Sequence, residues 1–350
     1  MRSFLSVALL FSLVTASPHK SHKKVSVSSQ AQAADHSKPP AGAIVVDPTG
    51  AVAGSFKTVQ EGSNALKNGS KPLTLFIMGG TYNEQVYFPP LNVSLVVIGQ
   101  TSDPKSYESN KVTIVNNISR NNVTLNDLTA TVRNWVANSK FYNINMVNNF
   151  GHSKVGGQNL ALSAQATNQG YYGCQFIGYQ DTILAELGNQ LYAKSKIEGV
   201  VDFIFGTSAK AWFQKVDIRT FDRGYITASG RANSSNPSWY VINQSTVDKR
   251  DHNVSDGSAF LGRPWKAYAR AVFQNTHLGS NVNASGWSQW NATLPNTEFS
   301  FLAEFNNSGP GAEKSGRAAF ARQLDAPIDI TSILGASWKS SSYVDLSYMS

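Results

Sequence analysis

The strongest indication of the fold comes from residues 171–216, YYGCQFIGYQDTILAELGNQLYAKSKIEGVVDFIFGTSAKAWFQKV. Tyr172, Tyr192 and Trp212 lie 20 residues apart, and an apolar residue follows each of them four or five positions later. Such a spacing, with short strands, predicts a β-solenoid in which each coil stacks on the previous one. A β-sandwich is the alternative, but its turns come every ~8 to 12 residues and carry no such repeat.

Short apolar segments broken by Gly, Asn and Asp continue this pattern on both sides. We expect strands at 43–46, 73–78, 95–98, 112–115 and 141–147. Residues 56–67 differ, because Phe56, Val59 and Leu66 favour a short amphipathic helix that Ser55 can cap. The sequence therefore predicts an all-β fold with one short N-terminal helix.

Three polar residues share a second spacing. Gln158, Gln180 and Asp202 lie 22 residues apart, which on a solenoid places them above one another on successive coils. Asp181 follows Gln180 directly, and Asp202 interrupts the apolar run 200–205. A carboxylate in such a run is costly to bury unless a partner stabilises it. Since neighbours on a strand point to opposite faces, Gln180 and Asp181 can share one cleft only where the strand kinks or ends.

The chain is basic, with a net charge of +8 and a sequence pI of about 9.4. A basic protein favours polyanions, which are nucleic acids, acidic membranes or acidic polysaccharides. The expected folded part contains no basic helix and no run of Lys or Arg. We therefore expect an acidic polysaccharide as the partner, and neither nucleic acid nor a membrane.

The N-terminus has the features of a secretory signal peptide. Arg2 precedes the apolar stretch 4–14, and small residues around Ala16 indicate cleavage there, so we assign residues 1–16 to the signal. Polar residues 17–41 form a linker or propeptide, and residues 42–350 form one folded domain. A signal together with several N-x-S/T sequons predicts a secreted, extracellular glycoprotein. The sequons begin at Asn68, Asn92, Asn117, Asn122, Asn233, Asn243, Asn253, Asn283, Asn291 and Asn306.

The only cysteine, Cys174, cannot form an internal disulfide. Its aromatic surroundings predict a buried apolar thiol, with a catalytic thiolate as the alternative. The histidines His152, His252 and His277 show no metal-ligand spacing, so we predict no metal site. We expect Glu84 to be structural.

Eight motifs, in order and with matching spacing, make the chain resemble the pectin methylesterase (pectinesterase) family in its fungal, secreted form. They are GGTYNEQV at 79–86, QNLAL at 158–162, GYQDTI at 178–183, VDFIFG at 201–206, YITASGR at 225–231, LGRPW at 261–265, GWSQW at 286–290 and GPGA at 309–312. The resemblance covers about 45–344. It implies a single-stranded right-handed parallel β-helix, the pectin-lyase-like solenoid. It also implies a cofactor-free, monomeric carboxylic ester hydrolase that converts the methyl esters of polygalacturonate to pectate and methanol, in the modification or degradation of cell walls.

The resemblance also implies the site residues. Asp202 would be the nucleophile, Asp181 the general acid and then the general base, and Arg263 the partner that orients Asp202 and keeps it ionised. Gln158 and Gln180 would donate N–H groups to the oxyanion. The sugar-contacting residues implied are Gln158, Val201, Phe205, Arg263 and Trp265. This chemistry requires the pKa values of the two carboxyl groups to be pushed apart by their surroundings.

The chain departs from the family pattern at three places. Ile183 and Leu184 stand where the family usually has leucine and tyrosine, which puts one stacking contact with the substrate in doubt. Val200 replaces the usual threonine before the nucleophile segment, and Ser229 replaces a glutamine. None of these changes removes a group assigned to catalysis.

Other interpretations remain open at this stage. The Asp202–Arg263 pair could only hold coils together, and Trp287 and Trp290 could be core residues or substrate contacts. A polygalacturonase or lyase on the same solenoid is a second enzyme candidate, although the chain lacks a dense acidic cluster for calcium. An esterase for another acyl group and a non-catalytic wall-binding protein are further alternatives.

Overall fold

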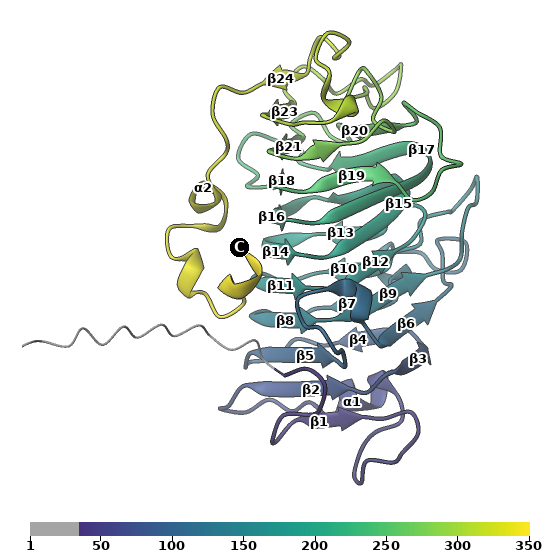
Figure 1. The fold of residues 1–350 in the computed structure, drawn as a ribbon, viewed down its shortest axis with the longest axis vertical. Helices are drawn as coiled ribbons and strands as arrows, with labels where there is room; N and C mark the ends of the chain where they lie inside the picture. Colours follow the sequence, from purple (N-terminus) through teal and green to yellow (C-terminus); the bar gives the residue numbers. More distant parts are fainter. Residues whose placement is uncertain (1–34) are drawn as a thin grey trace, which may run out of the picture. The chain divides into compact units, whose positions relative to one another are not determined.

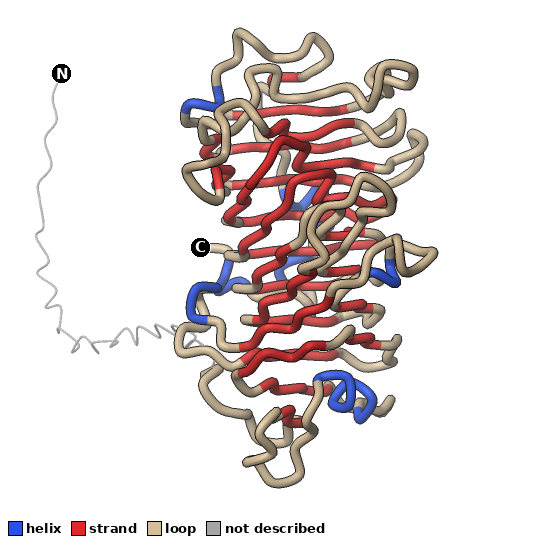
Figure 2. The backbone as a smooth tube through the Cα atoms, turned by 90° about the vertical axis from the view of Figure 1, so that its right-hand side faces the viewer, coloured by secondary structure: helices blue, strands red, loops and turns tan. Residues whose placement is uncertain are grey.

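The computed structural model describes residues 35–350. The predicted signal peptide, residues 1–16, and most of the predicted linker, residues 17–41, lie outside this part. The described residues are almost entirely strands and loops, with helices only as short segments (Figure 2). These are the α-helices α1 (Val59–Ala65) and α2 (Ile330–Leu334), and the 3-10 helices η1 (Tyr107–Ser109), η2 (Asp127–Thr129), η3 (Pro310–Ala312), η4 (Trp338–Ser340) and η5 (Leu346–Tyr348).

The strands form two parallel sheets, and within each sheet the strands follow one another along the solenoid (Figure 1). The first sheet has 11 strands, in the order β1 (Ile44–Val46), β2 (Leu73–Ile77), β5 (Leu95–Gly99), β8 (Ser139–Tyr142), β11 (Gln169–Tyr172), β14 (Leu187–Ala193), β16 (Ser208–Gln214), β18 (Trp239–Asn243), β21 (Arg270–Gln274), β23 (Phe301–Phe305) and β24 (Arg322–Gln323).

The second sheet has 13 strands and forms two faces of the solenoid. One face contains β3 (Gly80–Asn83), β6 (Val112–Asn116), β9 (Ile144–Asn148), β12 (Gln175–Ile177), β19 (Thr246–Lys249) and β22 (His277–Leu278). The other contains β4 (Val86–Phe88), β7 (Val132–Asn134), β10 (Leu162–Ala164), β13 (Ile183–Ala185) and β20 (Ala259–Arg263). The long strands β15 (Lys196–Gly206) and β17 (Asp217–Ser229) run through both faces and join them.

The predicted solenoid is confirmed, but its register differs from the prediction by one residue. Tyr171 pairs with Tyr192, and Tyr192 with Phe213, so the true step here is 21 residues rather than 20. These three rings stack inside the coils, with centroids 4.9 and 4.6 Å apart. Because side chains alternate along a strand, the one-residue shift puts Tyr172 and Trp212 on the outer face instead.

One residue with left-handed backbone marks the corner where many strands of the 11-stranded sheet end. Asn143 has φ 56° there and divides the predicted single strand 141–147 into β8 and β9. Equivalent corners occur at Gly173, Lys194, Lys215, Gln244, Asn275 and Asn306. Asn and Gly tolerate this conformation best, which explains the asparagines and glycines that interrupt the apolar segments.

The predicted N-terminal helix is confirmed as α1, but Ser55 is not its cap. Thr58 holds that position in a capping box, in which its side chain accepts from the Glu61 N–H. The two carboxylate oxygens of Glu84 accept from the Val59 and Gln60 N–H groups at 2.8 and 2.9 Å. Glu84 therefore ties the helix to β3, as expected for a structural residue.

After β24 the chain turns back and runs beside the 11-stranded sheet (Figure 1). Tyr343 and Tyr348 on this segment are buried against Tyr142 and Tyr172 of the sheet. The end of the predicted linker also packs here, because His36 is buried and its ring nitrogen lies 2.9 Å from the Asn143 side-chain oxygen. Cys174 is fully buried, as predicted.

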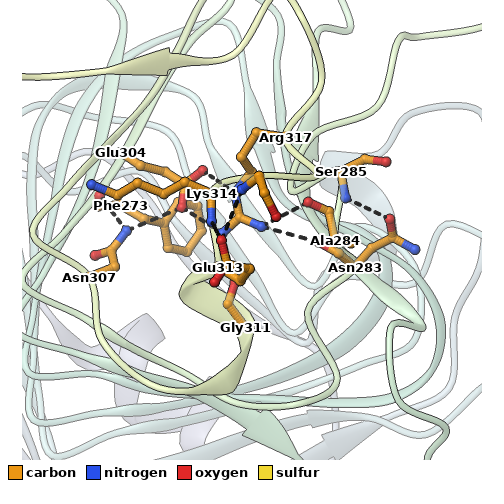
Figure 3. A network of polar contacts seen from close by, with 11 residues as sticks. Phe273, Asn283, Ala284, Ser285, Glu304, Asn307, Gly311, Glu313, Lys314 and Arg317 are labelled. Carbon is orange, nitrogen blue, oxygen red and sulfur yellow. Dashed lines mark hydrogen bonds and ion pairs between the residues drawn. The ribbon is translucent and has the colours of Figure 1, made fainter.

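A buried ion pair fixes the last coils (Figure 3). The Arg317 guanidinium donates to both carboxylate oxygens of Glu304 in β23, at 2.7 and 2.9 Å, and the two side chains are only 6% and 4% exposed. Arg317 also donates to the carbonyls of Gly311 and Ala284. It thereby anchors the loop that leads from Ala284 toward Trp290.

Candidate active site

The polar residues singled out in the sequence meet where β15 and β17 cross between the two faces of the 13-stranded sheet. Gln158 pairs with Gln180, as the 22-residue spacing predicts. Gln180, however, pairs with Val201 rather than with Asp202, so the prediction of a third 22-residue step is wrong by one residue. The same 21-residue step joins Gln175 to Lys196 and Ile183 to Ile204, so it is the regular step between these two coils.

Backbone conformation solves the problem of two neighbouring side chains on one strand. Asp181 has φ 65° and Asp202 has φ 51°, both in the left-handed region. A left-handed residue breaks the strict alternation of a strand, so Gln180 and Asp181 can face the same side. Aspartate tolerates this region better than most residues, but the strain is characteristic of functional sites.

These side chains line one pocket of about 270 Å³. Its walls contain all five residues to which we assigned catalytic roles, together with two of the predicted sugar-binding aromatic residues. The lining residues are Asn126, Gln158, Gln180, Asp181, Asp202, Phe205, Ala228, Arg263, Trp265 and Trp290. The spacing in the sequence thus corresponds to a single cavity in the fold.

Arg263 binds Asp202 through two parallel hydrogen bonds. Its Nε donates to Oδ1 at 2.8 Å and its Nη2 donates to Oδ2 at 2.7 Å. The guanidinium also lies over two rings, 4.0 Å from the Tyr225 centroid and 4.3 Å from that of Trp290. Bidentate bonds and stacking on two rings fix the orientation of Arg263, and therefore that of the Asp202 carboxylate.

The two aspartates differ in their electrostatic surroundings. Burial, and then the charge of Asp202, raise the pKa of Asp181 well above its usual range, while Arg263 and Arg120 oppose this rise. Burial also raises the pKa of Asp202, but the hydrogen bonds and charge of Arg263 pull it back. Because only Asp202 is bonded to the guanidinium, Asp202 is the group that ionises first and Asp181 the one that keeps its proton.

The side chains of Gln158 and Gln180 are half-buried in the pocket wall. Within residues 35–350, neither side-chain amide donates a hydrogen bond to another protein group. The main chain of Gln180 is held, because its N–H donates to the Asn159 side-chain oxygen at 3.0 Å. Both amides are therefore available as hydrogen-bond donors toward a group bound beside Asp202.

The predicted sugar-binding residues do not all line the pocket. Phe205 and Trp265 pack together in the pocket wall, with centroids 6.2 Å apart. Val201 is half-buried in the Gln180 ladder and is not among the lining residues. Of the two tryptophans left open, Trp287 is in the core, 1% exposed, and Trp290 lines the pocket.

Sequence reasoning missed Asn126 and Ala228 in the pocket wall. Asn126 lies in the loop 117–131 between β6 and β7, which carries none of the motifs quoted above. Ala228 is in the YITASGR segment and could have been found there, since it pairs with Arg263 in the β17–β20 ladder. Asn126 gave no comparable signal.

Among residues 35–350 no group of three metal-ligating side chains is found, and no helix is long and apolar enough to span a membrane.

Comparison with known proteins adds to this geometry. The model of the pectinesterase family matches residues 43–325. A pectinesterase of Aspergillus aculeatus is 47% identical over 91% of this chain and 96% of that protein, and one of Aspergillus niger is 46% identical with the same coverage.

Solved structures agree with the fold. The deglycosylated pectin methylesterase from Aspergillus niger superposes with a TM-score of 0.82 at 34% identity, covering 90% of this chain and all of that one. The pectin methylesterase from carrot superposes with a TM-score of 0.76 at 24% identity, covering 88% of this chain and 98% of that one. At this identity the likeness concerns the fold only. These neighbours confirm the predicted right-handed parallel β-helix.

Proposed function

The chain belongs to the pectinesterase family, and from that premise we propose how its residues act and where it works. It is a carboxylic ester hydrolase that acts on pectin. The observation that best supports the mechanism is the bidentate pairing of Arg263 with Asp202. The pocket around this pair also contains Asp181, Gln158 and Gln180.

In the first step an Asp202 carboxylate oxygen attacks the carbonyl carbon of a methyl galacturonate ester. The C=O electrons move onto the carbonyl oxygen, and the amide N–H groups of Gln158 and Gln180 stabilise that charge. The tetrahedral intermediate then expels the methoxy group, which leaves as methanol with the proton of Asp181. The product of this step is a mixed anhydride between Asp202 and the sugar acid.

In the second step the ionised Asp181 takes a proton from water as the water oxygen attacks the sugar acyl carbon. The bond to the Asp202 oxygen breaks, which releases the galacturonic acid and restores the Asp202 carboxylate. Asp181 is again protonated, so the cycle consumes one ester and one water and yields one methanol and one acid. Phe205 and Trp265 supply aromatic surfaces for the sugar rings.

Incubation with highly methylated pectin tests this function. We expect equal amounts of methanol and titratable acid, and no new reducing ends. New reducing ends would indicate a chain-cutting enzyme instead. Asp202→Ala should abolish methanol release with unchanged circular dichroism, whereas Asp248→Ala, at a half-exposed aspartate on β19, should remain active. Activity of wild-type level in Asp202→Ala would falsify the mechanism.

We further propose that the enzyme is secreted, acts on plant cell walls as a monomer, and comprises the signal peptide 1–16, the segment 17–41 and the domain 42–350. Expression in a eukaryotic host tests this through the N-terminal sequence and mass of the protein in the medium. Asn243 is 9% exposed and its amide hydrogen-bonds to Gln214, so we expect no glycan there. The exposed Asn92 and Asn291 are accessible sequons.

A further inference from the structure

The loop 117–131 reaches the active-site pocket with Asn126, and Arg120 of the same loop contacts Asn126. The mechanism gives neither side chain a role. Asn126 Nδ2 lies 3.4 Å from Asp181 Oδ2, within reach of a long hydrogen bond. Arg120 Nη1 donates to Asn126 Oδ1 at 3.1 Å. An arginine side chain has only donors, so the oxygen of the Asn126 amide must face Arg120 and its NH₂ group must face Asp181.

The loop holds Asn126 firmly. Asn126 directly precedes η2, whose first residue Asp127 accepts from the Arg133 Nε and Nη2 at 2.9 and 2.6 Å. Asp127 also accepts from the Ser163 hydroxyl of β10 at 2.8 Å. Asn126 is therefore carried by a turn that is anchored to two neighbouring strands, and its amide is placed before any substrate arrives.

Arg120 is tied to the other side of the pocket. Its backbone N–H donates to the Gln158 carbonyl oxygen at 3.1 Å. Among the described residues it forms no ion pair within 4.0 Å, and its Nε is buried without a hydrogen-bond partner. Arg120 is thus an uncompensated cation next to the pocket, and its charge favours the ionised form of Asp181.

We propose that Arg120 and Asn126 are positioning residues for the general acid, and that they keep the transferable proton of Asp181 on Oδ1. An amide N–H that faces Oδ2 makes that oxygen the acceptor, so the proton resides on the other oxygen. The same contacts stabilise the carboxylate that must form when methanol leaves. This inference rests on the proposed role of Asp181 as acid and base.

The charged groups that face Asp181 determine the pH dependence. Asp202 favours its protonated form, whereas Arg263 and Arg120 favour its ionised form. The reaction needs Asp181 protonated in the free enzyme, so the alkaline limb of kcat/KM reports its pKa. Loss of either Arg120 or the Asn126 donor raises that pKa, and the alkaline limb must move to higher pH.

The test is the pH profile of methanol release for four variants and the wild type. Asn126→Ala should lower kcat about tenfold and move the alkaline limb up by about half a pH unit to one unit. Arg120→Met should shift the limb in the same direction. Asn126→Asp keeps the shape but presents a carboxylate, so it should shift the limb further than Asn126→Ala.

Asn121→Ala is the matched control, because Asn121 is exposed in the same loop and its side chain forms, within residues 35–350, a single long hydrogen bond, to Ser153 at 3.4 Å. Its profile should equal that of the wild type. Titration of the polymer's own carboxylates cancels, since every profile is compared with the wild type on the same pectin. The thermal midpoint of each variant is measured in parallel.

Two outcomes would overturn the inference. One is an unshifted alkaline limb in Asn126→Ala and Arg120→Met, whether or not activity falls. The other is a shift of equal size in Asn121→Ala. Asp181→Asn separates this from the mechanism itself. If that variant retains wild-type activity the proposed mechanism fails, whereas an inactive Asp181→Asn with an unshifted Asn126→Ala overturns only the positioning role.

Discussion

The backbone N–H of Asp181 donates to the carbonyl oxygen of Val201, 3.0 Å away, so a main-chain ladder sets Asp181 beside the residue next to Asp202. Both aspartates then turn into the pocket through left-handed backbone. The relative position of the two carboxyl groups therefore depends on coil stacking, which is rigid, and not on flexible side chains. Substitutions at the site should change chemistry more than fold.

Arg263→Lys should lower kcat by about 100-fold, because an ammonium group cannot make two parallel bonds to Asp202 or stack flat on the rings of Tyr225 and Trp290. The positive charge beside Asp202 remains, so the acidic limb of the pH profile should shift only slightly even though kcat falls. Steady-state methanol release over a range of pH measures both. Arg223→Lys, at an exposed arginine, should be unaffected, and equal losses in both variants would contradict the assignment.

Trp265 and Trp290 should give different kinetic losses. Trp265 packs on Phe205 in the pocket wall, and within residues 35–350 its ring forms no hydrogen bond or cation–π contact with Asp181, Asp202 or Arg263. Trp265→Ala should therefore raise KM by about tenfold with a smaller effect on kcat. The Trp290 ring stacks on the Arg263 guanidinium, which is bonded to Asp202, so Trp290→Ala should lower kcat as well. Initial rates on pectin of one methylation degree separate the two. The same KM-to-kcat pattern in both variants would contradict this division.

Asp181→Asn should stabilise the protein at neutral pH while it abolishes activity. The folded-state pKa of Asp181 is raised above its unfolded value, so its contribution to stability is fully present below the unfolded pKa and is lost as pH rises through the folded pKa. Asparagine carries no charge and avoids that loss. The gain in thermal midpoint over the wild type should grow as the pH rises above about 4, the ordinary pKa of an unfolded aspartate. A gain that does not change with pH would count against a buried, ionising Asp181.

Arg317→Leu should destabilise the last coils by about 3–5 kcal/mol, because it leaves the Glu304 carboxylate buried without its partner (Figure 3). The double variant Arg317→Leu/Glu304→Leu should recover part of this loss, since no buried charge remains. Lys38→Met removes an ion pair whose side chains are 78% and 56% exposed, and should leave the midpoint unchanged. Chemical denaturation measures all three. A double variant less stable than Arg317→Leu would argue against the buried-charge explanation.

Local sequence pattern was sufficient for the architecture. The short apolar segments, their interruption by Asn and Gly, and a repeat near one coil length all follow from alternation and corner geometry, which are properties of neighbouring residues. The repeat was misjudged by one residue because Tyr172 and Trp212 are aromatic on the outer face as well. On the outer face these two rings pack in one cluster with residues of the C-terminal segment. The sequence around Tyr172 and Trp212 does not indicate that this distant segment covers them.

The motifs of the family named Asp181, Asp202, Gln158, Gln180 and Arg263, and the structure brings all five into one pocket. Only the tertiary structure could decide that Gln180 pairs with Val201, since the 21-residue step is set by how neighbouring coils pair along their whole length. Only the tertiary structure could show that Arg120 and Asn126 lie next to Asp181. These two residues are in a loop between strands, and a loop has no sequence repeat that would predict where its side chains lie. Short-range chemistry determines which coils form, and their stacking determines which side chains meet.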